Sequence, residues 1–345
     1  MKQLTMAQAI REAIREEMLR DETVFLMGED IGVFGGPFGV VSGLIDEFGA
    51  ERVRDTPISE TGFIGAAVGA ALTGMRPIVE VQYSDFLTCG MDQIVNQAAK
   101  MRFISGGQLK VPLVLRAPVG ATGRGSQHAQ SFYAWFMHCP GLKVIGPSTP
   151  YDAKGLMKTA IRDDNPVLFF EHKLLYGSHS LGSREVPSEK EPTAVSTSTG
   201  NVPEEEYTIP FGEADIKRKG GDVVIIATLL MVHKALRAAE ILSDQSIDVE
   251  VIDPRSFVPL DKQTILSSVK KTGRVVIVDE GCKTCGLGAE LSAIISEEAF
   301  DYLDAPVERV TAMDTPIPFS PILESMVIPD EQRIIEAVKK TISIN

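Results

Sequence analysis

The sequence predicts an α/β protein of two domains, a larger one built on a doubly wound parallel sheet and a smaller α/β one. Short apolar segments alternate with helical patterns along most of the chain, which favours parallel strands joined by crossover helices. A polar stretch at 177–210 interrupts this alternation. The length of 345 residues suits two domains of ordinary size.

Residues 1–176 form the predicted first domain, which opens with an amphipathic helical pattern carrying both acids and bases. Apolar segments of strand length follow at 23–27, 76–82, 111–115 and 167–170. Helical patterns separate them, at 62–74, 90–104 and 152–162. Strands separated by helices in this way predict a parallel sheet with helices on both faces.

The stretch 177–210 is rich in Ser, Thr, Pro and Glu and has almost no apolar residues. Because that composition cannot bury a core, we expect an exposed linker between the domains. A docking segment is the functional alternative.

Residues 211–345 form the predicted second domain, in which strands and helices alternate more regularly. The strand segments lie at 223–227, 249–252, 274–279 and 307–310. The helical segments lie at 233–242, 261–273 and 287–300. The longest apolar run, 223–232, is predicted as a buried strand, since a membrane span needs roughly 20 residues.

The chain is acidic, with a formal charge of −13 and a pI of about 5.0. This charge disfavours general binding to nucleic acid or anionic membranes, because their phosphates would be repelled. The N-terminus lacks the uninterrupted apolar core of a secretory signal. With four Cys and no export signal, we expect a cytoplasmic protein with reduced thiols.

The segment after 54, DTPISETGFIGAAVGAALTG, places Glu60 just before a helix of Gly, Ala, Ile and Val. Gly62, Gly65 and Gly69 recur at helical spacing and leave one face almost bare backbone, which another helix or a flat ligand can approach closely. A packed core helix with Glu60 as an N-terminal capping charge explains the same pattern.

His128 lies in a loop-like stretch, GATGRGSQHAQ. A loop histidine flanked by amides is well placed for proton transfer. Cys282 and Cys285 form a C-x-x-C that supplies only half of a four-ligand zinc site, so incidental thiols are favoured over a redox role. The glycine-rich stretch 32–43 fits no phosphate-binding motif and is predicted to be a mobile loop.

Several motifs resemble those of a known family of β chains. These β chains belong to the thiamine-diphosphate-dependent dehydrogenase, the first component of 2-oxo acid and acetoin dehydrogenase complexes. The motifs are GED at 28–30, DTPISE at 55–60, DQIVNQAAK at 92–100, QHAQ at 127–130, PGLKVIGPSTPYDAKGL at 140–156 and EHKLLYG at 171–177. The resemblance covers nearly the whole chain except 177–210. It implies a thiamine diphosphate pyrimidine-binding domain at 1–176 and a transketolase C-terminal-like domain at 211–345.

The resemblance implies that Glu60 faces the aminopyrimidine ring of thiamine diphosphate. A hydrogen bond to the ring nitrogen favours the imino tautomer, whose exocyclic nitrogen removes the thiazolium proton. Burial should raise the pKa of such a carboxyl. Glu29, Gln82 and Phe86 match further cofactor-binding positions. His128 is implied to line the channel to the thiazolium and to assist proton transfer or the lipoyl group.

Five residues match a loop that binds a monovalent cation in some relatives. The candidate cation here is K⁺. The five residues are Leu113, Ala160, Ile161, Asp163 and Asn165. The turn-forming sequence DDNP is equally consistent with a purely structural turn.

Thiamine diphosphate is normally held by a GDG…N motif that binds Mg²⁺, and no GDG occurs in this chain. The resemblance therefore implies that an α subunit binds Mg²⁺ and the diphosphate in an α2β2 heterotetramer. A lipoylated acyltransferase then accepts the acyl unit, an oxidoreductase activity with a disulfide acceptor.

Two alternatives remain, the C-terminal half of a split transketolase and a non-catalytic assembly subunit. The presence of Glu60 and His128 argues against the second. The substrate is acetoin, pyruvate or a branched-chain 2-oxo acid. EHKLLYG together with YTIPFGEA at 207–214 and DTPIPFS at 314–320 leans towards acetoin.

Overall fold

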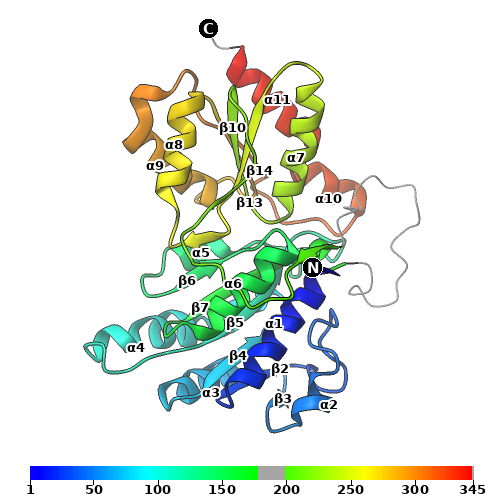
Figure 1. The fold of residues 1–345 in the computed structure, drawn as a ribbon, viewed down its shortest axis with the longest axis vertical. Helices are drawn as coiled ribbons and strands as arrows, with labels where there is room; N and C mark the ends of the chain where they lie inside the picture. Colours follow the sequence, from blue (N-terminus) through cyan, green and yellow to red (C-terminus); the bar gives the residue numbers. More distant parts are fainter. Residues whose placement is uncertain (178–198, 344–345) are drawn as a thin grey trace. The chain divides into compact units, whose positions relative to one another are not determined.

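The computed structural model describes residues 1–177 and 199–343, and the chain divides into two compact α/β units (Figure 1). Unit 1 comprises Met1–Val119 and Trp135–Pro210, and unit 2 comprises Gly120–Ala134 and Phe211–Asn345. Residues 120–134, which carry His128, were assigned to the first domain from the sequence. In the structure they cluster with unit 2, and we call them the His128 segment.

Six neighbouring strands of unit 1 form a parallel sheet. Their order is β6 (Lys143–Ile145), β7 (Val167–His172), β5 (Val114–Val119), β4 (Arg76–Glu80), β2 (Val24–Gly28) and β3 (Val53–Asp55). All four strands predicted for this domain are present. Three-residue strands such as β3 and β6 were missed because they are too short to show a periodic pattern.

Helices and shorter helical turns connect these strands. They are α1 (Met6–Arg20), α2 (Leu44–Phe48), α3 (Glu60–Leu72), η1 (Ser84–Gly90), η2 (Gln93–Ala98), α4 (Ala99–Ile104), α5 (Tyr133–Met137), α6 (Pro150–Arg162) and η3 (Lys173–Leu175). The predicted helix at 90–104 is thus a π-helical segment followed by a short α-helix. Thr5 and Gln8 begin α1 with a reciprocal capping box.

Part of the predicted linker packs on unit 1. β8 (Gly200–Val202) pairs antiparallel with β1 (Lys2–Leu4), and Val202 is fully buried. Ile209 is also buried, against the bare backbone of Gly155 in α6. Both residues are isolated in a polar stretch, so the average composition of the stretch did not indicate that they are buried. Residues 178–198 of the predicted linker lie outside the described residues.

Unit 2 contains a five-stranded sheet. The order is β14 (Glu308–Ala312), β13 (Val275–Cys282), β10 (Val223–Ala227), β11 (Val249–Asp253) and β9 (Asp215–Arg218). The edge strand β9 is antiparallel and the other pairings are parallel. The remaining elements are β12 (Ser256–Val258), α7 (Leu230–Ser243), α8 (Lys262–Thr272), α9 (Leu287–Ala299), η4 (Phe300–Tyr302), α10 (Pro321–Val327) and α11 (Glu331–Ile342).

The strand predicted at 223–227 is confirmed as β10, but the interpretation of the whole apolar run 223–232 as one buried strand is wrong. β10 ends at Ala227, and α7 begins at Leu230. The chain turns at Leu229, which has a φ of +51°, a conformation rarely adopted by residues other than Gly. Periodicity could not reveal this change because every residue of the run is buried. No helix in the described ranges is long and apolar enough to cross a membrane.

Candidate active site

Three predicted site residues follow three neighbouring strands of unit 1. Glu29 follows β2, Glu60 begins the helix after β3, and Gln82 lies just beyond β4. Gly28 is in register with Asp55 of β3 and with Glu80 of β4. The three segments therefore leave the sheet at its carboxyl edge, where open parallel sheets bind their ligands.

Glu29 is a buried carboxyl group beside the start of α3, with 7% of its surface exposed. The backbone N–H of Ser59 donates a hydrogen bond to it, and its Oε1 has no hydrogen-bond partner in the described chain. Burial, and then the neighbouring carboxyl groups of Glu60 and Asp30, raise the pKa of Glu29. The structure thus brings Glu29 and Glu60 together and favours the neutral form of Glu29.

Helix α3 has one buried face and one open face. Phe63, Ile64 and Val68 are buried, whereas Gly62 and Gly69 are exposed. A Cβ atom added at Gly69 would have no heavy atom within 4 Å. Glu60 is half-buried in the first helical turn, where the helix dipole stabilises negative charge. A second molecule can therefore approach this backbone closely.

Phe86 in η1 forms part of an aromatic wall next to Gln82. Its ring lies edge-on to that of Tyr83, with centroids 5.6 Å apart. Tyr83 in turn lies edge-on to Phe38 at 5.7 Å. Gln82 and Phe86 are both half-buried. A flat ring at the site would meet a wall that its neighbours hold in place.

A buried ion-pair cluster, not predicted from the sequence, lies beside the carboxyl edge. The Arg116 guanidinium makes two bonds of 2.8 Å to Glu171 and one of 2.5 Å to Glu80. The Tyr176 hydroxyl donates to Glu171 at 2.6 Å. Burial raises the pKa of Glu80. The available signal was a charged residue, Glu80, Arg116 or Glu171, in each of three largely apolar strands, which implies mutual pairing.

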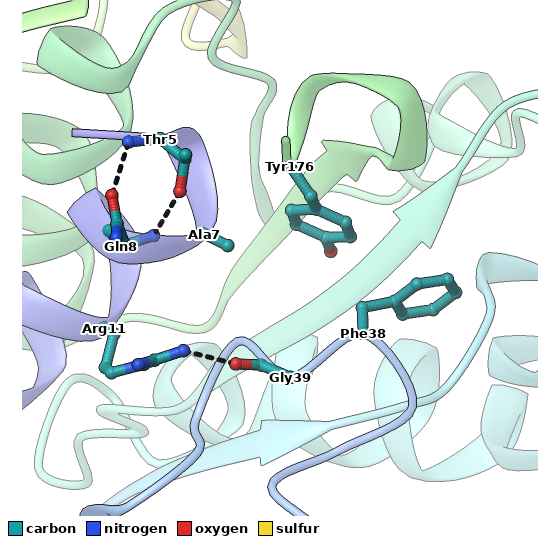
Figure 2. A pocket seen from close by; sticks show the side chains of 7 residues that line it. All are labelled: Thr5, Ala7, Gln8, Arg11, Phe38, Gly39 and Tyr176. Atoms are coloured by element: carbon teal, nitrogen blue, oxygen red, sulfur yellow. Dashed lines mark hydrogen bonds between the residues drawn. The ribbon is translucent and has the colours of Figure 1, made fainter. Parts of the chain in front are cut away.

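The glycine-rich loop at 32–43 is tied down at several points. Arg11 donates to the carbonyl oxygens of Gly39 and Val40, and the Gly32 backbone N–H donates to Asp55. Figure 2 shows the contact of Arg11 with Gly39 near the rings of Phe38 and Tyr176. These residues line a cavity of about 200 Å³. The predicted site residues do not line this cavity.

His128 belongs to unit 2, whereas Glu29 and Glu60 belong to unit 1. It is half-buried, and its backbone N–H donates to the Gly125 carbonyl at 3.2 Å. The predicted proton-transfer residue and the predicted cofactor acid are thus carried by different compact units.

The predicted cation loop has its carbonyl oxygens directed at protein donors. Arg76 donates to the carbonyls of Ile161 and Asp163 at 3.0 and 3.1 Å. The carbonyl of Leu113 accepts from the Val167 N–H at 2.8 Å, and that of Ala160 from the Asp163 N–H at 3.3 Å. The Asn165 side chain links Arg102 to Asp163.

The C-x-x-C cysteines are free, exposed thiols at the end of β13. Partial burial of the sulfur, followed by the carboxyl groups of Asp314 and Asp279, raises the pKa of Cys282, which keeps it a protonated and weakly reactive thiol. Within the described ranges no group of three or more His, Cys, Asp or Glu residues is placed to hold a metal ion.

Comparison with known proteins places this geometry in a family. Residues 2–178 match the transketolase pyrimidine-binding domain, and residues 212–334 match the transketolase C-terminal domain. A solved structure described as a split-gene transketolase, inactive beta4 tetramer, superposes with a TM-score of 0.75 over 99% of both chains. At 21% identity, that likeness shows the fold alone.

Sequence relatives are much closer. The pyruvate dehydrogenase E1 component subunit beta of Rickettsia felis is 49% identical over 98% of both chains. The acetoin:2,6-dichlorophenolindophenol oxidoreductase subunit beta of Bacillus subtilis is 44% identical over 96% of this chain and 95% of that one, and its Cupriavidus necator counterpart is 46% identical over 99% and 98%. These matches confirm the resemblance stated from the motifs and the two-domain fold. The chain therefore belongs to the family of β subunits of pyruvate dehydrogenase E1 components and acetoin oxidoreductases, built from transketolase pyrimidine-binding and C-terminal domains.

Proposed function

We propose that this chain is the β subunit of a thiamine-diphosphate-dependent dehydrogenase that transfers an acyl unit from a 2-oxo acid or acetoin to a lipoyl group. The observation that carries the proposal is the Glu29–Glu60 pair at the carboxyl edge of the sheet, in a chain of this family. Transketolase-type domains imply thiamine diphosphate as the cofactor.

The residues at this edge fit the pyrimidine end of the cofactor. When bound, the cofactor supplies a nucleophilic carbon and an electron sink. Glu60 would hold a proton at the pyrimidine ring nitrogen, and Phe86 would form one wall of the ring site. Glu29 has a buried oxygen that has no hydrogen-bond partner among the described residues and can accept a further hydrogen bond. The raised pKa of Glu29 reflects its burial and the cost of a second negative charge beside Glu60.

An α subunit would supply what this chain lacks. The sequence contains no GDG motif, and a net charge of −13 would repel a diphosphate. Apolar side chains near Glu29 and Glu60 in the sequence are exposed, with Val33 at 93%, Phe34 at 72% and Ile58 at 85%. We propose that the α chain binds Mg²⁺ and the diphosphate, covers these side chains, and assembles with this chain as an α2β2 heterotetramer.

A monovalent cation is a smaller part of the proposal. Each carbonyl oxygen of the loop at Ala160 and Ile161 has a second lone pair that can coordinate K⁺. If K⁺ binds the folded state, the melting temperature should be higher in potassium chloride than in choline chloride at equal ionic strength. Equal melting temperatures in the two salts would show that Arg76 and the turn alone organise this loop.

The activity is tested by expressing the chain together with a candidate α chain. Pyruvate, acetoin and a branched-chain 2-oxo acid are supplied in turn with a lipoylated acyltransferase. We expect lipoyl-dependent acyl transfer with pyruvate or acetoin, both of which can donate a two-carbon acyl unit. Transfer of ketol units between sugars without a lipoyl acceptor would support the split-transketolase alternative instead.

A further inference from the structure

The His128 segment, Gly120–Ala134, is held at both ends by consecutive residues of β13. At one end the Ala121 backbone N–H donates to Glu280 Oε1 at 2.7 Å. At the other end the Tyr133 hydroxyl donates to Asp279 Oδ1. All of these residues belong to unit 2. Because successive side chains of a strand point in different directions, one strand end can hold two chain segments.

The Tyr133 anchor is deeply buried. Tyr133 and Asp279 are both fully buried, and the Tyr133 ring packs on Phe257 with centroids 5.1 Å apart. The Thr228 hydroxyl also approaches Asp279 Oδ1, at 3.4 Å. Burial raises the pKa values of both Tyr133 and Asp279, which favours a neutral pair. The hydrogen bond between Tyr133 and Asp279 is therefore a buried contact and not an ion pair at the protein surface.

A third carboxyl group holds the middle of the segment. Both oxygens of Glu324, in α10, accept from the Gly123 backbone N–H, at 3.0 and 2.8 Å. The Ser126 hydroxyl donates to the Ile317 carbonyl at 2.9 Å. A Cβ atom at Gly125 would lie 3.1 Å from the ring of Phe319. The backbone just before His128 is thus fixed against unit 2 on several sides.

We propose that Glu280 and Glu324 are positioning residues for His128. They hold the backbone of the His128 segment to unit 2 and so set where the imidazole is presented to the acyl-transfer step. The inference rests on the proposed function of His128, but the clamp itself can be measured without any activity. Hydrogen bonds from backbone N–H groups to carboxylates are shorter and stronger than neutral ones, which suits a clamp.

The first test compares two substitutions of Glu280 in the assembled enzyme. Glu280→Ala removes the acceptor for the Ala121 N–H, whereas Glu280→Gln keeps an acceptor oxygen of similar reach. Because misplacement by about 1 Å can cost about 10²-fold in rate, lipoyl-dependent turnover should fall by about that factor in Glu280→Ala. Glu280→Gln should recover most of the loss. Glu290→Ala, an exposed acid on α9, is the matched control.

The second test asks whether Glu280 acts through His128. His128→Ala should slow the lipoyl-dependent step, and adding Glu280→Ala to it should cause little further loss, since the group to be positioned is already absent. Independent, multiplicative losses in the double variant would overturn the proposal. If His128→Ala alone kept the wild-type rate in single-turnover assays, the role of His128 would fail, and the clamp would be judged by proteolysis.

Arg124 is exposed within the segment, so trypsin cleavage after it reports how firmly the segment is held. Cleavage should be faster in Glu280→Ala than in the wild type, and near the wild-type rate in Glu280→Gln and Glu290→Ala. Equal cleavage rates in all four proteins would show that Glu280 does not hold the segment, whatever the catalytic turnover of the variants.

Discussion

At the residue scale, two carboxyl groups decide whether the site works as proposed. The sequence motifs predicted positions for Glu29 and Glu60. They could not show that Glu29 is buried, that its Oε1 has no partner among the described residues, or that burial and then Glu60 raise its pKa. Those properties depend on the register of β2 with β3, which brings distant segments together. Residue identity was predictable, whereas electrostatic environment was not.

Glu60→Gln should fold normally and lose activity. The amide has the same shape but cannot release a proton to the pyrimidine ring. Turnover of the assembled enzyme should fall by about 10²-fold or more, the scale of a general acid–base contribution. Glu51→Gln, whose side chain is 96% exposed, is the control. Near-normal turnover by Glu60→Gln would remove Glu60 from the mechanism.

Glu29→Gln should change how stability depends on pH. Because the pKa of Glu29 is higher in the folded than in the unfolded chain, its contribution to stability is fully present below the usual carboxyl value of 4.5 and is lost as pH rises through the raised pKa. The variant does not lose this stability as the pH rises, because its amide group does not ionise. Its melting temperature relative to wild type should therefore increase as the pH rises above 4.5. A difference that stays constant with pH would mean that Glu29 is not perturbed.

At the element scale, most long periodic elements were predicted and most short or interrupted ones were not. The strands and helices predicted between 223 and 310 alternate as expected, since most are long enough to show their period. The amphipathic helix α11 was not predicted, although its pattern is regular. The failures have physical causes: Leu229 turns the chain inside an apolar run, and Val202 anchors a polar stretch to unit 1. The His128 segment packs with unit 2 through tertiary contacts with Glu280 and Glu324. A local sequence pattern cannot predict such contacts.

Helix α3 gives a prediction for the open face at Gly69. Since a Cβ atom there would meet nothing within 4 Å, Gly69→Ala should stabilise the chain by about 0.5–1 kcal/mol through helix propensity. Gly69→Leu, by contrast, should weaken assembly with the α chain if that chain packs on the bare backbone. Chemical denaturation measures the first effect, and size-exclusion chromatography of the mixed chains measures the second. Unimpaired assembly of Gly69→Leu would place the α chain elsewhere.

At the scale of the whole molecule, the chain carries only part of a cofactor site. In the proposed function Glu60 and its surroundings hold the pyrimidine end, whereas the acidic sequence contains no GDG motif for a magnesium diphosphate. Predicted site residues are also divided, with Glu60 in unit 1 and His128 in unit 2. We therefore propose that activity depends on assembly with an α chain that completes the site.

Titration calorimetry with thiamine diphosphate and Mg²⁺ tests this claim most directly. The chain is titrated alone, the α chain alone, and then the two chains together. We predict negligible heat with this chain alone and tight, magnesium-dependent binding to the mixture, with lipoyl-dependent activity appearing in the same sample. Glu60→Gln mixed with the α chain should still assemble, which separates loss of cofactor activation from loss of assembly. Tight magnesium-dependent binding of thiamine diphosphate to this chain by itself would contradict the two-chain account.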